Sequence, residues 1–529
     1  MKPRRSTPGY SYCGTTVARR DDAAFDAPAL QTRRTYAKHA GRRECTRWLI
    51  ACLALAGLPL TAFAHAFGER YDLPAPLTYF MAGGAAVVAL SFVAAALFAR
   101  AHPGHAAAHS FVISAGALLP ALRVVARIIG LAFFVIAIIA GLYGSRSPEA
   151  NITPTLVWLI WWIGLSLTVA CVGNLWPAFD PWRTLFDLAE ALARRCGRSD
   201  GIALHWRYPA ALGVWPAAFL LLLFSWFEVI YLKASIPSHI ATVALCWSAF
   251  TLGGMLLFGR EQWQRNADVF AVYFATLGRF APVALEAGSD REIALRPWGR
   301  ALTGAAAPPA GTVAFVIAML STVLFDGLLG GQLWSVTQRA LNARFPHWAD
   351  DGGYFTGSIG LIATWLLFLA AYLLICAITR HFAGGRSPRT IARLFVLTLV
   401  PIAVAYLVAH NFANLLIQGQ LMIPLASNPL GWKWDLFGSA GFEPDIGIID
   451  ARITWYVAIS SIVIGHVISV WLAHRVALRE YGTPQRAVIA SIPLTLLMIV
   501  YTAISLSVIA EPLVQFKGAE GVEVSAPSR

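Results

Sequence analysis

Ten apolar runs, each of about 17 to 27 residues, recur between residues 77 and 510 of the chain. A helix rises 1.5 Å per residue, so about 20 apolar residues cross about 30 Å of hydrocarbon. Lipid cannot hydrogen-bond a free backbone group, and the alternation typical of a β-barrel strand is absent, so each run predicts a spanning helix. The predicted spans are 77–98, 128–144, 152–175, 209–231, 236–258, 311–330, 355–378, 391–417, 453–474 and 487–510.

The composition leads to the same class of protein. Only 13% of the 529 residues are charged, whereas 57% are hydrophobic. Soluble globular proteins carry about 25% charged residues, so this chain has too little polar surface to cover a core in water. These values exclude a soluble enzyme, a disulfide-stapled secreted domain and a disordered protein. The sequence therefore predicts an all-α fold, a polytopic transmembrane helix bundle in a lipid bilayer.

Lys and Arg residues gather in alternate loops. Of the 41, 21 fall in the loops that would face the cytoplasm, 9 in the outer segments and the rest in the leader. Cytoplasmic loops of membrane proteins are enriched in these residues. The alternation predicts a multi-pass protein of the bacterial inner (plasma) membrane with both mature termini in the periplasm. The net charge of +13 then reflects topology and does not indicate nucleic-acid binding.

Residues 1–64 form a basic leader whose apolar run, 48–64, ends in small residues before His65. This pattern is typical of a signal peptide. An uncleaved signal anchor, or a start codon assigned too far upstream, would also explain it. We expect a ten-span domain over 65–512 and a polar tail over 513–529. The stretches 181–195 and 263–284 place apolar residues at helical spacing opposite charges, which predicts interfacial amphipathic helices.

A few ionisable residues lie within the predicted spans, where each costs roughly 2.5–3.5 kcal/mol on insertion scales. Glu228 and Asp326 lie near the outer ends of the fourth and sixth spans, His410 lies in the outer part of the eighth, and His466 lies past the middle of the ninth. Converging imidazole and carboxylate groups suit a divalent metal or acid–base catalysis. The pattern therefore predicts an outward-facing polar cavity built around His410 and His466.

Three interpretations of these groups stay open. His410 and His466 would bind a divalent, zinc-like metal, with Asp326 and Glu228 as the acidic partners; a separate copper site would form at His65 if cleavage there frees its α-amino group. The cavity would otherwise hold no metal and relay protons, or the groups would simply join helices by hydrogen bonds. A helix break expected near 411–418 would help to bring the two histidines together. No named catalytic motif is present to choose between these.

The loop 427–442 is rich in aromatic residues and glycine and carries Asp435. It would either cover the site as a lid or anchor the protein at the membrane interface.

Four segments resemble a bacterial family of polytopic membrane proteins that carries the name fenitrothion hydrolase. They are Ala64-His-Ala-Phe-Gly-Glu-Arg-Tyr-Asp-Leu-Pro-Ala-Pro76, Asn174-Leu-Trp-Pro with Asp180-Pro-Trp-Arg-Thr184, Asn428-Pro-Leu-Gly-Trp-Lys-Trp-Asp-Leu-Phe-Gly438, and Gly465-His-Val-Ile-Ser-Val-Trp-Leu-Ala-His-Arg-Val-Ala-Leu478. The resemblance implies hydrolysis of an apolar small molecule, an aryl phosphotriester, at the P–O–aryl bond. It also implies a second membrane subunit.

If this activity holds, a metal on His410 and His466 would lower the pKa of bound water towards about 7. Asp326 or Asp435 would then orient that water. The alternative is a protein that is not an enzyme: a proton- or metal-coupled transporter, or a structural subunit of a membrane complex.

Overall fold

The computed structural model describes residues 75–98, 111–285, 291–304, 306–350 and 352–510, which are mostly helical. Within these ranges, nine helical segments are long and apolar enough to cross a membrane. The chain is therefore an all-α polytopic helix bundle, as the apolar runs predict. The leader, His65 and the C-terminal tail lie outside the described residues.

The long segments follow the predicted spans closely in position. They are α2 (Leu77–Phe98), α3 (Leu118–Tyr143), the run α4 (Ile152–Pro154), η3 (Thr155–Gly164) and α5 (Leu165–Cys171), then α9 (Pro237–Phe258), α12 (Thr312–Leu329) and α14 (Tyr354–Ala383), the run α15 (Pro388–Phe395), η5 (Val396–Leu399), α16 (Val400–Gln418), η6 (Gly419–Leu421) and α17 (Met422–Ser427), and finally α18 (Ala451–Tyr481) and α19 (Pro484–Ala510).

Shorter elements connect these segments. They are η2 (Pro148–Ala150), α6 (Trp176–Phe179), α7 (Pro181–Arg195), α8 (Trp215–Val229), α10 (Arg260–Asn266), α11 (Val269–Gly278), η4 (Arg300–Thr303) and α13 (Gln332–Arg344), with the strands β1 (Phe111–Ser114), β2 (Val283–Ala284) and β3 (Glu292–Leu295).

Two predicted spans differ from the helices that form. The fourth, 209–231, becomes α8, which has only 15 residues and would rise about 22 Å. The second, predicted to begin at residue 128, begins at Leu118 in α3. Arg123 and Arg127 lie in this extra length, and both guanidinium groups are bonded, to the Leu285 carbonyl and to Asp187. A charged residue with a partner does not have to end a helix, so the apolar pattern alone places the boundary too late.

The helix break that we expect near residues 411–418 does not occur. Helix α16 continues to Gln418 and tightens into the 3₁₀ turn η6 only from Gly419. The Asn411 amide donates to the Leu407 carbonyl one turn earlier, so this polar residue bonds within the helix instead of interrupting it.

A small antiparallel sheet, which the sequence pattern does not predict, joins two of the loops. Its order is β1-β3-β2, with Phe111 and Val283 both opposite Leu295. Two, or at most four, residues per strand are too few to show a period-two pattern.

The two stretches predicted as interfacial helices have different surroundings. Residues 181–195 form α7, whose Leu188 and Leu192 are exposed, as an interfacial helix requires. Within 263–284, however, α11 is almost completely buried, because eight of its ten residues are packed inside the protein. Its sequence, Val-Phe-Ala-Val-Tyr-Phe-Ala-Thr-Leu-Gly, is apolar on every side, which suits a buried helix.

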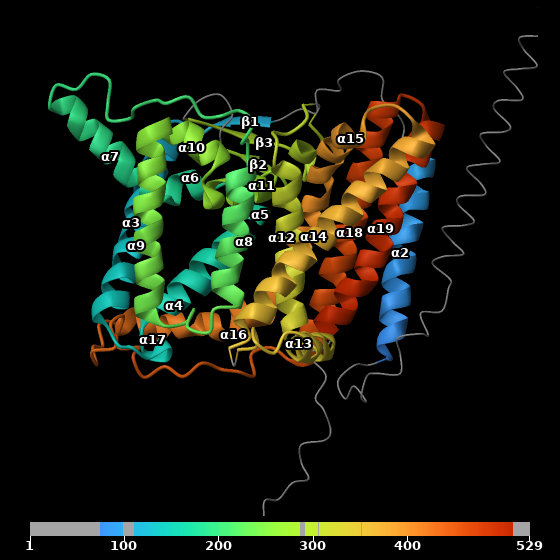
Figure 1. Ribbon diagram of the computed structural model, residues 1–529. Coiled ribbons are helices and arrows are strands. Elements are labelled where there is room, and N and C mark those ends of the chain that lie inside the picture. The colour runs from blue at the N-terminus through green and yellow to red at the C-terminus, as the bar shows by residue number, and fades with distance from the viewer. Residues whose placement is uncertain (1–74, 99–110, 286–290, 305, 351, 511–529) are drawn as a thin grey trace, which may run out of the picture. The chain divides into compact units, whose positions relative to one another are not determined.

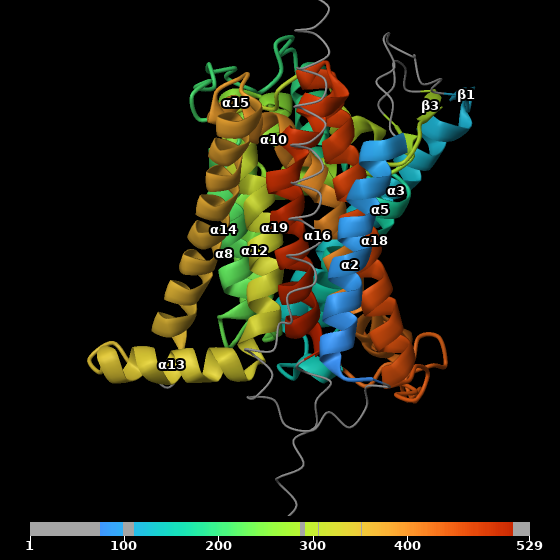
Figure 2. The ribbon, with the colours of Figure 1, turned by 90° about the vertical axis from the view of Figure 1, so that its right-hand side faces the viewer.

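Figure 1 shows α10, α15 and the strands at one end of the helices, and α13 and α17 at the other. We call these the α15 end and the α13 end. The Arg-rich loops predicted to face the cytoplasm lie at the α15 end, and the acidic loop 418–452 lies at the α13 end. Helix α13 runs across the ends of the long helices (Figure 2).

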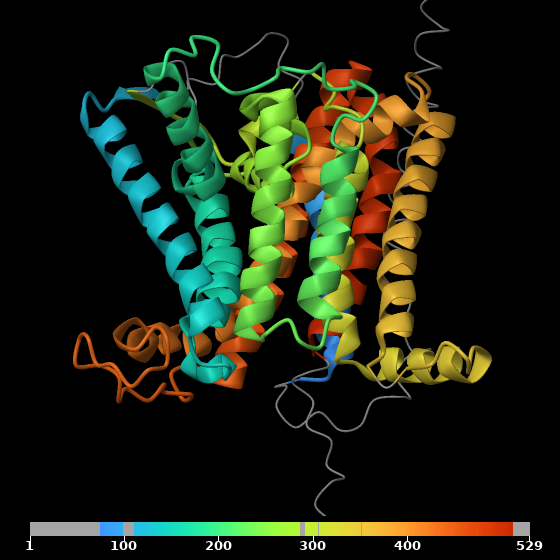
Figure 3. The same ribbon diagram turned by 60° about the vertical axis from the view of Figure 1, so that its left-hand side comes forward.

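Helix α18 lies along α16, α19 and α2. At Gly465 it comes so close to α16 that a Cβ atom would overlap the Ala405 side chain and lie 2.8 Å from the Pro401 carbonyl oxygen. Helices α3 and α9 pack against each other in a second group, with α8 nearby (Figure 3). Of the candidate site residues, His410 and His466 belong to the first group, Asp326 lies on α12 and Glu228 lies on α8.

Candidate functional site

Asp326 and His410 form the closest pair among the predicted site residues. Asp326 lies one turn before the end of α12, and His410 lies about two turns before the end of α16. His410 Nε2 is 2.9 Å from Asp326 Oδ2, and both side chains are about one-third exposed. Two residues 84 positions apart in sequence, on α12 and α16, therefore place a carboxylate against an imidazole towards the α13 end.

This pairing determines which ring nitrogen of His410 is free to act as a base. In the neutral ring, Nε2–H donates to the carboxylate, so Nδ1 keeps its lone pair. No described residue hydrogen-bonds Nδ1. A carboxylate that orients an imidazole in this way is the arrangement used for general-base catalysis and for proton relay.

Tyr406 lies one turn from His410 on α16, and the two rings stack with centroids 6.2 Å apart. Its hydroxyl is buried and has no hydrogen-bond partner among the described residues. A Cβ atom on Gly327, the residue after Asp326, would lie 2.9 Å from this hydroxyl and 2.7 Å from Val508. The absence of a side chain at Gly327 thus lets Tyr406 reach the Asp326 turn.

Glu228 also approaches this site. It is half-buried on α8, which packs against α12, and its carboxyl is near enough to that of Asp326 for their charges to repel each other. The structure thus brings together three of the predicted residues: Asp326, His410 and Glu228.

His466 occupies a different environment from His410. It is 1% exposed, and its Nδ1 donates to the Ile462 carbonyl at 2.8 Å. Its Nε2 is buried without a partner, and its ring lies 5.6 Å from that of Tyr501. Two turns further along α18, His474 Nδ1 is 3.2 Å from the Ser491 hydroxyl.

Asp435 shapes the loop that carries it. Its Oδ1 accepts hydrogen bonds from the Ser427 hydroxyl at 2.6 Å and from the Ala440 backbone N–H at 3.0 Å. The Ser427 bond, followed by the Ala440 bond, lowers the pKa of Asp435 below its ordinary value. The nearby Trp432, Trp434 and Phe437 are exposed, as an interfacial anchor requires.

No three His, Cys, Asp or Glu side chains in the described ranges are arranged to hold a metal ion. His65, the separate candidate metal ligand at the mature terminus, lies outside these ranges. Metal binding by His410, His466 and His65 stays a prediction.

A cavity of about 770 Å³ lies between α3, η3, α8, α9 and α11. Its walls are almost entirely apolar and are formed largely by aromatic rings: Phe133, Phe134, Trp158, Trp161, Trp176, Trp182, Phe224, Trp226, Phe227, Trp247 and Phe270. Trp226 and Phe227, the two residues before Glu228, belong to this wall. A cavity of this size and chemistry suits an apolar or aromatic molecule.

Sequence reasoning missed this cavity because its walls come from distant segments. One local signal was available, the cluster of Trp158, Trp161 and Trp162 in the third predicted span. These residues lie in η3, a π-helix whose wider turn is rare and often occurs at functional sites.

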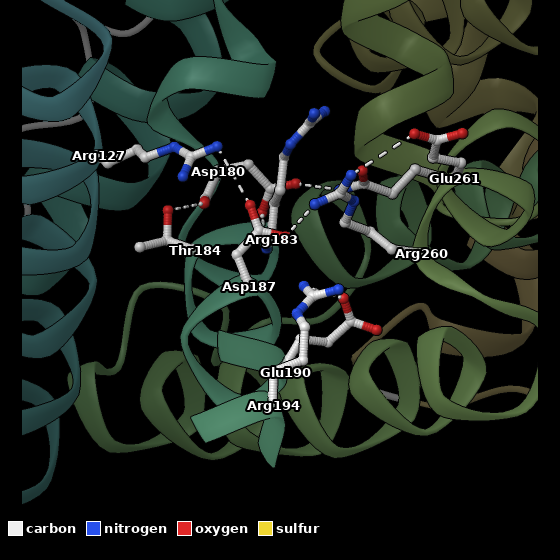
Figure 4. A network of polar contacts seen from close by, with 10 residues as sticks. Arg127, Asp180, Arg183, Thr184, Asp187, Glu190, Arg194, Arg260 and Glu261 are labelled. Atoms are coloured by element: carbon white, nitrogen blue, oxygen red, sulfur yellow. Dashed lines mark hydrogen bonds and ion pairs between the residues drawn. The ribbon is translucent and has the colours of Figure 1, made fainter. Parts of the chain in front are cut away.

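A second polar network lies at the start of α7, towards the α15 end (Figure 4). Arg127 and Arg260 both form ion pairs with Asp187, which ties α7 to α3 and α10. Asp180 caps α7 by accepting from the Trp182 and Arg183 backbone N–H groups.

Asp180 and Asp268 are both completely buried and are the N-cap residues of α7 and α11. Gln264 donates to Asp180, and Thr251 donates to Asp268 at 2.9 Å. Burial, and then the charge of Asp268, raises the pKa of Asp180 to about 8, and burial also raises the pKa of Asp268. This pair orders two helix starts and favours a protonated carboxyl between them.

Comparisons with protein families, curated proteins and solved structures find no match to this chain. The fold and composition define a multi-pass helical membrane protein, with a carboxylate–imidazole pair on α12 and α16 as its candidate functional site.

Proposed function

We propose that this protein hydrolyses an apolar aryl phosphotriester, the activity that its resemblance to the fenitrothion hydrolase family implies, with Asp326 and His410 as the general-base pair. The observation that supports this proposal is the 2.9 Å contact between Asp326 Oδ2 and His410 Nε2, which leaves Nδ1 as a proton acceptor. The proposal places the α13 end towards the periplasm, as the Lys and Arg distribution predicts.

The reaction would proceed at phosphorus. His410 Nδ1 takes a proton from water as the water oxygen bonds to phosphorus, and the P–O–aryl bond breaks with its electron pair on the phenolate. The proton on His410 then passes to the phenolate or to bulk water, which restores the neutral ring. Asp326 holds Nε2–H throughout and stabilises the transient imidazolium.

The aromatic cavity beside Glu228 supports the choice of substrate class. Apolar phosphotriesters partition into lipid, so a protein that takes them from the bilayer requires an apolar chamber. The wall residues Trp226 and Phe227 connect this chamber with the helix turn that carries Glu228, which in turn interacts with Asp326.

The test is release of nitrophenolate from a dialkyl 4-nitrophenyl phosphate by the purified full-length protein. We expect His410→Gln and Asp326→Asn each to lower kcat by about 100-fold or more, the usual contribution of a general base. His347→Gln is the control, because His347 is exposed just after α13. Wild-type turnover in His410→Gln would refute the proposal, and loss of activity to a chelator with recovery on zinc would favour the metal route instead.

Proton-coupled transport is the second candidate. It is favoured by the buried polar groups that continue beyond Asp326 and His410, namely Tyr406 on α16 and His466 on α18. Folded protein that releases no nitrophenolate but moves protons across vesicle membranes would support this candidate over hydrolysis.

A further inference from the structure

Six buried polar atoms on the neighbouring helices α16, α18 and α19 have no hydrogen-bond partner among the described residues, and two of them, Trp455 Nε1 and Tyr481 Oη, lie near the two ends of α18. The other four are Tyr406 Oη on α16, His466 Nε2 and Ser469 Oγ on α18, and Ser505 Oγ on α19. All four side chains are at most 2% exposed. Helix α18 packs along both of the other helices, so these atoms belong to one interface.

Ser469 of α18 and Ser505 of α19 differ from three neighbouring hydroxyl residues of α19. Ser491, Thr495 and Thr502 each donate to the carbonyl four residues earlier, which satisfies a hydroxyl inside a helix. Ser469 and Ser505 do not make this bond. The Ser505 hydroxyl lies beside the Tyr501 hydroxyl, and the Ser469 hydroxyl is available to a partner between the helices.

In the same interface, His466 has a ring nitrogen, Nε2, that can accept a hydrogen bond but receives none from the described residues. Because its Nδ1–H bonds to the Ile462 carbonyl, its Nε2 carries only a lone pair and requires a donor. Gly465 and Ala405 lie at a close contact between α18 and α16, and they directly precede His466 and Tyr406 in sequence. Tyr501 of α19 packs against His466 and interacts electrostatically with Tyr406.

An unsatisfied buried polar group costs about 1–3 kcal/mol, and native proteins usually satisfy such groups with ordered water. Four in one interface would therefore be a severe penalty if the interface were dry. A water molecule can donate to His466 Nε2 and also accept from a tyrosine or serine hydroxyl, so water matches all four atoms.

We propose that water molecules bound between α16, α18 and α19 join the Asp326–His410 pair to His466 and extend towards His474, and that they carry protons along this line. His410 stacks on Tyr406 at one end of the line, and His474 bonds to Ser491 at the other. Along α18, the eight residues from His466 to His474 span about 12 Å. Each step moves one proton along a hydrogen bond, and no other bond changes. This inference does not depend on hydrolysis.

The first test is X-ray radiolytic labelling of the full-length protein, in which radicals formed from bound water modify adjacent side chains. We expect Tyr406 and His466 to be labelled several-fold faster than Tyr372. Tyr372 is the matched control because it is equally buried but donates to the Ala392 carbonyl at 2.8 Å. Labelling of Tyr406 and His466 no faster than Tyr372 would show that the interface is dry and would overturn the proposal.

The second test measures proton entry into vesicles that contain the protein, with a potassium diffusion potential as the driving force. We expect entry above that of protein-free vesicles, and a decrease of several-fold in His466→Phe and in Ser469→Ala. The serine variant removes only a hydroxyl, so it keeps the test valid if His466→Phe does not fold.

Ser91→Ala is the control, because the Ser91 hydroxyl of α2 already bonds to the Val88 carbonyl. Equal proton entry in wild-type and protein-free vesicles would overturn the proton-carrying part of the proposal. This result would not affect the hydrolysis assay, so failure of the two proposals can be told apart.

Discussion

The helix group of α16, α18 and α19 and the group of α3, α8, α9 and α11 differ in how they fill space. In an apolar stretch of 18 residues within Pro388–Ser427, 83% of the residues are buried in the protein, whereas the value for the corresponding stretch within Leu118–Tyr143 is 22%. The first group contains buried tyrosine, histidine and serine side chains at close helix contacts. The second surrounds an aromatic cavity of about 770 Å³.

The first group therefore holds buried ionisable side chains, and the second group provides the apolar cavity. Ionisable groups in a bilayer must be held by neighbouring helices, and close packing of small residues such as Gly465 and Ala405 provides that. The aromatic rings of the second group line a space that they do not fill, which leaves room for an apolar molecule. The proposed reaction would use both properties.

The largest expected effect comes from breaking the close contact in the first group. In Gly465→Ala, the new methyl group overlaps Ala405 and meets the Pro401 carbonyl, so we expect a loss of about 1–3 kcal/mol in unfolding free energy. Unfolding of the detergent-solubilised protein measures this loss.

Gly253→Ala on α9 is the matched change in the second group. Nothing lies within 4 Å of its Cβ position, so we expect no loss and up to about 1 kcal/mol of gain from the better helix former. Equal losses in the two variants would mean that the groups do not differ in packing.

An intermediate effect concerns the polar network that anchors the second group. A carboxyl whose pKa is raised by folding stabilises the protein fully below its ordinary pKa of 3.8, and this contribution disappears as the pH rises to about 8. We therefore expect the Tm of the wild type to fall between pH 5 and pH 8 relative to that of Asp180→Asn.

Asp350→Asn is the control for this pH dependence. Backbone N–H groups at Phe355 and Tyr354 lower the pKa of Asp350, so its contribution is lost only as the pH falls through that lowered value. The Asp350→Asn variant should therefore show the same change of Tm with pH as the wild type between pH 5 and pH 8. If Tm changes with pH equally in Asp180→Asn and in the wild type, Asp180 is ionised throughout this range.

The smallest effect on stability is expected within the cavity. Ala244 lines it, so Ala244→Leu adds apolar volume to open space and should change the unfolding free energy by less than about 0.5 kcal/mol. Ala458→Leu on α18, where Ala458 is 1% exposed, should cost about 1–3 kcal/mol. Similar losses would indicate that the cavity closes in the membrane.

Helix boundaries were predictable wherever apolar length alone decides them. Residues 77–98 match α2, and residues 181–195 match α7, in which Asp180 is a regular N-cap before Pro181. Prediction failed where a tertiary partner changes the outcome. Arg123 and Arg127 continue α3 because distant groups bond them, and Asn411 fits into α16 because its amide bonds backward.

For the candidate site too, the sequence predicted which residues matter but not which of them are in contact. The cost of burying charge was enough to select Asp326, His410 and Glu228 from the sequence. It did not show that His410 pairs with Asp326, since the two residues are 84 positions apart and their meeting depends on how α12 and α16 pack. Asp435 was selected for its residue type, but its bonds to Ser427 and Ala440 are local.

The sequence by itself determined that this chain is a helical membrane protein, because the length and apolarity of a segment decide whether lipid accepts it. Only the tertiary structure decided which polar groups meet, where the aromatic rings leave space, and which buried atoms lack a partner. Those properties depend on contacts between helices far apart in the chain, and no local pattern of residues encodes them.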